Sequence, residues 1–310
     1  MSPKHTANHN PAVTRRKFVM NTAKAVGVLA LSPLASKASH LTLTETYTVG
    51  QIMDLFIKQV PGGALPSTVD TLKSGDRDIK VSGIVTTMFA TIAVIRKAIE
   101  LGANFIIAHE PTFYNHADDT TWLQGNEVYQ YKADLLKKHN IAVWRNHDYI
   151  HRLVPDGVSK GLLDQLQWQK YADKSTLNIP NIINLPSMPL KDIIAHVKTK
   201  LGIDQVRYIG DPAQTCSRVL LMPGAAGGQR QIQSIARTKP DVMICGEIQE
   251  WETAEYVRDA RAKGDKLALI VLGHIASEDP GSEFMLDWVR KNVPGVKVTR
   301  VKPGASLSFM

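Results

Sequence analysis

The sequence predicts an α/β protein with two lobes, each a mostly parallel sheet covered by helices, and three observations lead to that class. At 310 residues the chain is long enough for two medium-sized domains that each bury a core. Short apolar runs alternate with segments of helical periodicity, which is the order of strand, helix, strand units. Polar side chains directly follow several apolar runs, the position at which parallel sheets carry functional residues.

The first predicted unit is a strand, a helix and a second strand. Residues 81–86 form the first strand, and apolar positions recur at helical spacing through 92–99. The apolar run 103–108 predicts the second strand. His109 and Glu110 follow it, so both are expected at the carboxyl end of a parallel strand.

The same alternation continues to the end of the chain. A predicted helix over 133–139 leads into a strand, and the polar segment 147–151 follows that strand. The later apolar runs predict strands at 141–144, 218–222, 242–245 and 267–272. His274 and Glu278 come directly after the last of these strands.

The amino-terminal segment has the features of an export signal. Arg15 and Arg16 precede a mildly apolar run at 25–31, which is too short to span a bilayer as a stable helix. A small-x-small pattern at 36–38 suits cleavage after Ala38. Paired arginines before a weak apolar region indicate twin-arginine export to the periplasm. The alternative is a disordered tail with a chance pair of arginines.

The net charge of +8 at first favours an anionic partner such as nucleic acid. Residues 1–38 contain six Lys and Arg residues and no Asp or Glu, so they supply +6 and leave +2 for the rest. That remainder has no basic run and lacks the charge distribution of a dedicated nucleic-acid binder. It also has no apolar run of about 18 residues, so no membrane association is expected once the signal is removed.

The two cysteines, Cys216 and Cys245, are too few for a disulfide framework and lack CxxC spacing. We expect buried thiols. A single bridge between them stays an alternative in an oxidising compartment, because both lie next to predicted strands.

Three predicted strand ends carry groups that bind metals. They are His109 with Glu110, the segment 147–151, and His274 with Glu278. Donors on rigid supports converge when their strands are parallel neighbours, as a transition metal requires. Because His274 and Glu278 are four residues apart, a helix there points both side chains the same way. The alternative is that each histidine is structural, or that His147 or Asp148 only caps a helix.

The prediction for domain organisation follows from a less regular stretch at residues 160–215. Four prolines punctuate that stretch: Pro180, Pro186, Pro189 and Pro212. We therefore place a junction there and expect a signal at 1–38, a metal-binding α/β lobe formed by 41–160 together with 265–310, and a second α/β lobe at 161–264. The metal site is expected at strand ends between the lobes.

Four sequence elements, in the right order, resemble the NIF-three-like dinuclear metal proteins, also known as GTP cyclohydrolase type-two homologues. The elements are the strand, helix, Gly102-Ala103, strand and His109-Glu110-Pro111 unit; His147-Asp148-Tyr149-Ile150-His151 followed by Gly157-Val158; the glycine-rich turn 223–228 with Gly246-Glu247; and Gly273-His274-Ile275-Ala276-Ser277-Glu278. The family's corresponding motifs are His-His-Pro, His-Thr-x-x-Asp, Thr-Gly-Glu and Gly-His-x-x-Ser-Glu.

The resemblance implies five metal ligands. His109, His274 and Glu278 match the family's ligands directly, whereas Glu110 stands at its second His and His151 at its Asp. The total number of imidazole and carboxylate donors is unchanged, so we interpret the two positions as having exchanged donors. The alternatives are that Asp148 supplies the carboxylate through a shifted loop, or that one of two metal positions is lost.

The resemblance further implies a dinuclear hydrolase that uses metal-activated water and assembles as a toroidal hexamer. Glu247 and His147 are the candidates for acid/base work. His and carboxylate donors suit Zn, Fe, Mn or Ni alike. The glycine-rich turn lacks a P-loop Gly-Lys-Ser/Thr, and an exported protein seldom meets GTP, so a different small-molecule substrate is expected. The alternative function is a non-enzymatic metal-binding or assembly protein.

Overall fold

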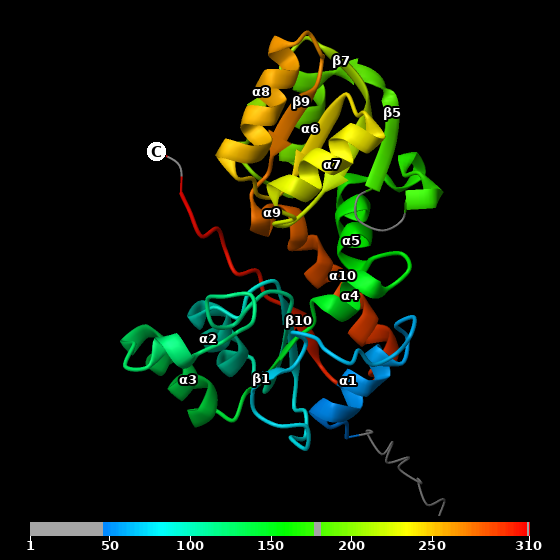
Figure 1. Ribbon diagram of the computed structural model, residues 1–310. Helices are drawn as coiled ribbons and strands as arrows, with labels where there is room; N and C mark the ends of the chain where they lie inside the picture. The colour runs from blue at the N-terminus through cyan, green and yellow to red at the C-terminus, as the bar shows by residue number, and fades with distance from the viewer. Residues whose placement is uncertain (1–45, 177–180, 309) are drawn as a thin grey trace, which may run out of the picture. The chain divides into compact units, whose positions relative to one another are not determined.

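The chain folds as a mixed α/β protein with two five-stranded sheets, which confirms the predicted fold class (Figure 1). The computed structural model describes residues 46–176, 181–308 and 310. The predicted export signal at 1–38 lies outside these described residues. Within them, no helix is long and apolar enough to cross a membrane.

The first sheet has the strand order β1-β4-β3-β2-β10. Its strands are β1 (Leu72–Ser74), β2 (Ile84–Thr87), β3 (Phe105–Ala108), β4 (Ala142–Arg145) and β10 (Val298–Arg300). β4, β3, β2 and β10 are parallel, and β1 pairs with β4 in the antiparallel sense. Four of the five strands therefore run in one direction, as the strand and helix alternation predicts.

Two helix layers cover this sheet. Its helices are α1 (Val49–Ile57) and α10 (Pro280–Asn292) on one face, and α2 (Ile92–Glu100) and α3 (Glu127–Lys138) on the other. Successive strand residues face opposite sides of a sheet. Phe105 and Ile107 accordingly join the core that contains Phe56 and Trp288, while Ile106 and Ala108 join the other core.

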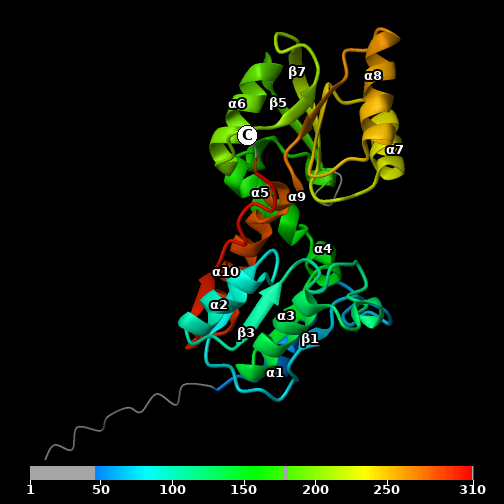
Figure 2. The same cartoon turned by 90° about the vertical axis from the view of Figure 1, so that its left-hand side faces the viewer.

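The second sheet has the order β5-β7-β8-β9-β6. Its strands are β5 (Asn181–Pro189), β6 (Arg207–Ile209), β7 (Thr215–Met222), β8 (Val242–Cys245) and β9 (Ala268–Val271). Helices α5 (Gly157–Leu166) and α6 (Leu190–Leu201) pack on one face, and α7 (Gly228–Thr238) and α8 (Glu255–Ala262) on the other. Figure 2 shows α6 and the α7–α8 pair on opposite sides of this sheet. β7, β8 and β9 are parallel, and β5 and β6 are antiparallel edges.

Several short helical segments complete the described structure. They are α4 (Asp148–Arg152), α9 (His274–Glu278), three 3-10 turns at Thr121–Leu123, Gln169–Tyr171 and Lys174–Thr176, and a π-helical turn at Glu250–Ala254. α4 follows the carboxyl end of β4, and α9 follows the carboxyl end of β9. Both therefore start at the strand ends that the sequence analysis singled out.

The irregular stretch predicted at 160–215 contains a nine-residue strand, β5. Pro186 and Pro189 obscure it in the sequence, because proline cannot donate a hydrogen bond to a sheet. β5 tolerates both because it is an edge strand: β7 is its neighbour in the sheet, and on its other side Ile183 makes an isolated bridge to Ala172. Its register with β7 also shifts between Asn184 and Met188.

Residues 265–310 were predicted to belong to the first lobe. β9 lies within that range, yet it is hydrogen-bonded to β8 and β6 in the second sheet. The division into domains stays a prediction, but the chain crosses from the second sheet towards the first only after β9. α10 then packs against β2 and β10.

Cys216 and Cys245 are both free and buried, so the alternative of a disulfide is wrong. β7 pairs with β8 so that Met222, six residues after Cys216, lies opposite Cys245. The two thiols also belong to the cores on opposite faces of the sheet. Disulfides need Cα atoms within about 7 Å, which this register does not allow.

Candidate metal centre

The first group of site residues extends from two neighbouring strands. Ala108, the last residue of β3, lies opposite Arg145, the last residue of β4. His109 and Glu110 therefore emerge beside Asn146 and His147. The backbone N–H of Asn146 donates to the Ala108 carbonyl at 2.8 Å, so the parallel pairing extends one residue into the site.

Helix α4 carries His151 into the same region, and a distant carboxylate fixes the start of that helix. His147 is its N-cap residue but makes no side-chain cap. Asp70 takes that role: its Oδ1 accepts from the His147 N–H at 2.8 Å and its Oδ2 accepts from the Tyr149 N–H at 2.7 Å. Burial is the largest effect on Asp70 and raises its pKa despite these bonds.

The second sheet contributes the remaining groups. Cys245 of β8 lies opposite Val271 of β9, so Glu247 and His274 follow neighbouring strand ends. Helix α9 confirms that His274 and Glu278 point the same way, since His274 Nε2 and Glu278 Oε2 are 2.9 Å apart. Gly224, after β7, has a φ of +72°, and a Cβ there would lie 2.2 Å from Glu278 Oε1. Only glycine lets the turn pass so close to that carboxylate.

The four histidines predicted for the site, at positions 109, 147, 151 and 274, are each held through Nδ1. A carbonyl or carboxylate oxygen can only accept, so each Nδ1 carries the donated proton. The Nδ1 acceptors are Asn146 O for His109 (3.2 Å), Asp148 Oδ1 for His147 (3.0 Å), Asp156 Oδ2 for His151 (2.7 Å) and Glu247 Oε1 for His274 (3.0 Å). Each Nε2 is thereby left to bind a ligand, the arrangement typical of metal-binding histidines.

The metal-binding groups form two sets. The imidazole set is His109, His147 and His151, whose nitrogens lie within 4.8 Å of one another. The carboxylate set is Glu110, His274 and Glu278. Within the carboxylate set, His274 Nε2 lies 3.3 Å from Glu110 Oε1 and 2.9 Å from Glu278 Oε2.

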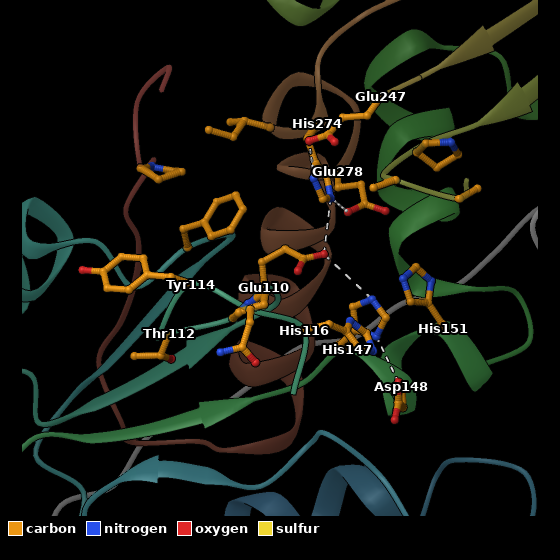
Figure 3. Close-up of a pocket in the computed structure, with 18 of the residues that line it drawn as sticks. Glu110, Thr112, Tyr114, His116, His147, Asp148, His151, Glu247, His274 and Glu278 are labelled. Carbon is orange, nitrogen blue, oxygen red and sulfur yellow. Dashed lines mark hydrogen bonds and ion pairs between the residues drawn. The ribbon is translucent and has the colours of Figure 1, made fainter. Parts of the chain in front are cut away.

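Glu110 and Glu278 reach from the carboxylate set to the imidazole set. Glu110 Oε1 lies 3.8 Å from His147 Nε2, and Figure 3 shows it between His147 and His274. Glu278 Oε2 lies 3.4 Å from His109 Nε2 and 2.9 Å from His274 Nε2. His109, Glu110 and Glu278 also form a group within 4.8 Å.

The electrostatics follow from burial and mutual proximity. Burial lowers the pKa of His274, but the hydrogen bonds that its ring donates to Glu110, Glu247 and Glu278 outweigh burial and raise that pKa to about 12. Burial also lowers the pKa of His109, but the nearby carboxylates of Glu278 and Glu110 outweigh burial and raise that pKa to about 9. Burial and the neighbouring histidines lower the pKa of His147 to about 4, which keeps its ring neutral.

A buried arginine supports Glu110 from behind. The Arg145 side chain is fully buried, and its Nη2 lies 3.5 Å from Glu110 Oε2. The same guanidinium contacts Asp118 Oδ2 at 3.4 Å and donates to the His116 carbonyl. Burial opposes ionisation of Glu110, but the nearby histidines lower its pKa to about 2.

These donors fit a divalent transition metal, and one atom tests the fit. His109 Nε2 is buried and makes no hydrogen bond, although Glu278 is near. A buried polar atom without a hydrogen bond is costly, and a metal that displaces the Nε2 proton would satisfy this nitrogen. His and Glu groups here can therefore hold a metal.

The site opens into a large cavity of about 1380 Å³. Its walls include residues after the strand ends of both sheets and the carboxyl-terminal segment 303–306. Tyr114, His116, Arg152 and Arg230 also line it. The metal-binding groups thus face a space large enough for a small molecule.

Six of the seven predicted site residues line this cavity: Glu110, His147, His151, Glu247, His274 and Glu278. The seventh, His109, is buried beside them, with Nε2 3.4 Å from Glu278 Oε2. His147, predicted for acid/base work, lies in the imidazole set. Asp148 was the alternative carboxylate ligand. Its oxygens instead accept from His147, from the Thr68 hydroxyl and from the Val69 N–H.

Sequence reasoning missed the supporting residues. Asp156 stands before Gly157 and caps α5, a helix-start signal that the sequence offered. No sequence signal marks Asp70, Asn146 or Arg145, since their roles come from contacts between distant segments.

A pair of three-layer α/β units whose strand ends share a His/Glu site defines the class of this protein. The family model for Duf34/NIF3 (NGG1p interacting factor 3) matches residues 69–303, and the chain belongs to that family.

Relatives and solved structures agree with the assignment. The chain is 27% identical over 218 residues to a GTP cyclohydrolase 1 type 2 homolog of Clostridium perfringens, covering 67% of this chain and 78% of that protein. It is 24% identical over 223 residues to the Escherichia coli K12 homolog, covering 68% and 81%. A Staphylococcus aureus hypothetical protein has the same fold, with a TM-score of 0.67, 21% identity and coverage of 83% of this chain and 97% of that one. A Bacillus cereus protein related to NIF3 also has a TM-score of 0.67, with 17% identity and coverage of 86% and 99%.

Proposed function

We propose that the protein is a divalent-metal-dependent hydrolase that holds one or two transition-metal ions. The observation that supports this most is the common orientation of the four histidines, each with Nδ1 on a protein acceptor, which leaves Nε2 to bind a metal. The Nε2 atoms of His109, His147 and His274 lie 3.4, 3.8 and 2.9 Å from an oxygen of Glu110 or Glu278. The proposed ligands are His109, Glu110, His151, His274 and Glu278, with His147 as a further donor.

When bound, divalent ions supply Lewis-acid chemistry and bring the pKa of water towards neutrality. The residues of the chain hold the metal-binding side chains in place and transfer protons. Glu247 fixes His274 through Nδ1, and its half-exposed side chain lets it exchange protons with the cavity. Its pKa is lowered by the hydrogen bond from His274, so its carboxylate is ionised at neutral pH and able to accept a proton.

The cavity favours an enzyme over the non-enzymatic alternative. A storage or structural metal site closes its donors around the ion, whereas a catalytic site leaves one side open. The side chains of His147, His151 and His274 remain about one fifth exposed, at 23, 21 and 17%, and they line a cavity of about 1380 Å³. Because the relatives are named GTP cyclohydrolase 1 type 2 homologs, GTP is one of the first substrates to test.

Two further parts of the proposal rest on the sequence. Twin-arginine export to the periplasm is supported by the paired Arg15 and Arg16, and it accords with a metal inserted before export of the folded protein. Assembly as a homo-oligomer, a hexamer by resemblance, is proposed with it.

The full chain tests the activity with a defined panel: GTP, p-nitrophenyl phosphate and p-nitrophenyl acetate. We expect hydrolysis of at least one substrate that a chelator abolishes and added Zn²⁺ or Mn²⁺ restores. Glu247→Gln should lower kcat while leaving metal content close to that of the wild type. Equal rates before and after chelation contradict metal-dependent hydrolysis, and metal binding without any turnover of the panel favours the non-enzymatic alternative.

A further inference from the structure

The two sets of donors differ in chemical type. The imidazole set offers three nitrogens, and its rings pack closely: His109 stacks on His147 with centroids 4.9 Å apart, and His151 approaches both edge-on. The carboxylate set offers two carboxylates and one nitrogen around His274. The exchange at positions 110 and 151 therefore preserves the donor total but places three imidazoles in one set and two carboxylates in the other, with His109 within reach of both carboxylates.

Glu278 joins the two sets through one oxygen. Its Oε2 lies between His109 Nε2, at 3.4 Å, and His274 Nε2, at 2.9 Å. The side chain is 4% exposed, and Gly224 closes off Oε1. Because this oxygen is near both sets, any difference between a metal in the imidazole set and a metal in the carboxylate set must come from the other donors.

Arg145 determines which oxygen of Glu110 faces the histidines. The guanidinium lies next to Oε2, so Oε1 is the oxygen directed at His274 and His147. Glu110 is thus oriented so that it offers one oxygen to a metal. A histidine at this position would offer a nitrogen instead. The buried positive charge of Arg145 also favours the ionised carboxylate.

We infer that the two positions have different metal preferences and form a mixed-metal centre, with the imidazole set selecting a borderline ion such as Zn²⁺ and the carboxylate set accepting a harder ion such as Mn²⁺. This rests on the proposed metal binding. Imidazole nitrogen suits Zn²⁺, Ni²⁺ and Cu²⁺, whereas carboxylate oxygen suits Mn²⁺. Zn²⁺ binds more tightly than Mn²⁺ at most sites, so the prediction concerns the ratio of the two affinities, which should be larger at the imidazole set.

The test uses the full chain loaded with Mn²⁺ and titrated with Zn²⁺, with released Mn²⁺ measured by the electron paramagnetic resonance signal of the free ion. We expect release in two steps whose Zn²⁺ midpoints differ by at least about tenfold. His151→Ala should remove the early step and Glu110→Ala the late one. Release in a single step, or the reverse assignment, overturns the inference.

An exchange variant provides a second measurement. Glu110→His with His151→Asp returns both positions to the family pattern and mixes the donor types. We expect the two midpoints to approach each other in this variant, and unchanged midpoints overturn the inference. If the wild type binds neither Mn²⁺ nor Zn²⁺, the proposed function fails with it, whereas single-step release from a chain that binds both ions contradicts the mixed-metal centre alone.

Discussion

At the scale of single residues, the site depends on side chains that hold other side chains. Each of the four histidines uses Nδ1 for a protein acceptor, which selects the tautomer and leaves Nε2 to bind a metal. Residues that bind nothing themselves, such as Asp156 and Arg145, therefore affect metal affinity. Loss of such supporting contacts typically weakens metal binding by about 10- to 100-fold.

Gly224→Ala tests how closely the glycine-rich turn confines Glu278. The new Cβ would lie 2.2 Å from Glu278 Oε1, so the carboxylate must move, and we expect metal affinity to fall by at least about tenfold. Gly227→Ala is the matched control, because Gly227 has a similar φ of +81° with nothing within 4 Å of its Cβ. Isothermal titration calorimetry measures both affinities. Equal losses in the two variants would show that backbone strain, and not Glu278, is responsible.

Metal binding should release protons and strengthen as pH rises. In the metal-free chain, the pKa of His109 is about 9 and that of His274 about 12, so both are protonated at pH 7. A metal needs the unprotonated Nε2, so binding displaces these protons. Folding stability depends on pH in the opposite direction. The contribution of His109 to the free energy of unfolding is fully present below its unfolded pKa of 6.5 and is lost as pH rises through about 9. Calorimetry in buffers of different ionisation enthalpy measures the number of protons released on metal binding. A metal affinity that does not change between pH 6 and 8 would contradict the assignment of His109 and His274 as ligands.

At the scale of elements, short helices after strand ends position the ligands. α9 was foreseeable because His274 and Glu278 are one helical turn apart. The start of α4 was not, because its cap comes from Asp70, which is 77 residues before His147. β5 was missed for a related reason: its prolines are acceptable only at a sheet edge, and the edge position is a property of the folded chain.

Asp70→Asn tests the link between helix α4 and the metal centre. An amide keeps one acceptor oxygen in place of the two that hold the His147 and Tyr149 N–H groups. We expect a loss of about 0.5–2 kcal/mol in unfolding free energy together with weaker metal binding. Thr48→Ala removes the cap of α1 and should cost similar stability with unchanged metal affinity. Denaturant unfolding measures the stability of both variants, and metal titration measures their affinity. If both variants lost the same metal affinity, the link between α4 and the metal centre would be contradicted.

The register of the second sheet makes a prediction about the thiols. Cys216 and Cys245 lie in different cores, and burial raises the pKa of Cys245 to about 12. We expect neither thiol to react with a thiol reagent at neutral pH in the folded protein, and both to react after unfolding without a reductant. Intact-mass measurement after alkylation counts them. A pair protected from alkylation in the unfolded chain would reveal the disulfide that the register excludes.

At the scale of the whole described chain, the site combines strand ends from both sheets. Alternating apolar runs were enough to predict the class, and β8 was predicted with the bounds that it has. The ligands were predictable because they follow strands directly along the sequence. Arg145 and Asn146 were not, since the sequence does not say which neighbouring strand each of them faces. β9 shows the same limit, because its sequence gives no sign that it pairs in the second sheet.

The most direct test of the central claim is the metal content of the purified full chain beside that of a Glu110→Ala, His151→Ala double variant. After dialysis against trace metal, inductively coupled plasma mass spectrometry should find one or two ions per wild-type chain and clearly fewer in the double variant. Glu100→Ala with His139→Ala is the matched control, since it removes an exposed carboxylate and an exposed imidazole outside the site. We predict that this control retains the wild-type content. Equal metal in all three proteins would contradict a metal centre built from these residues.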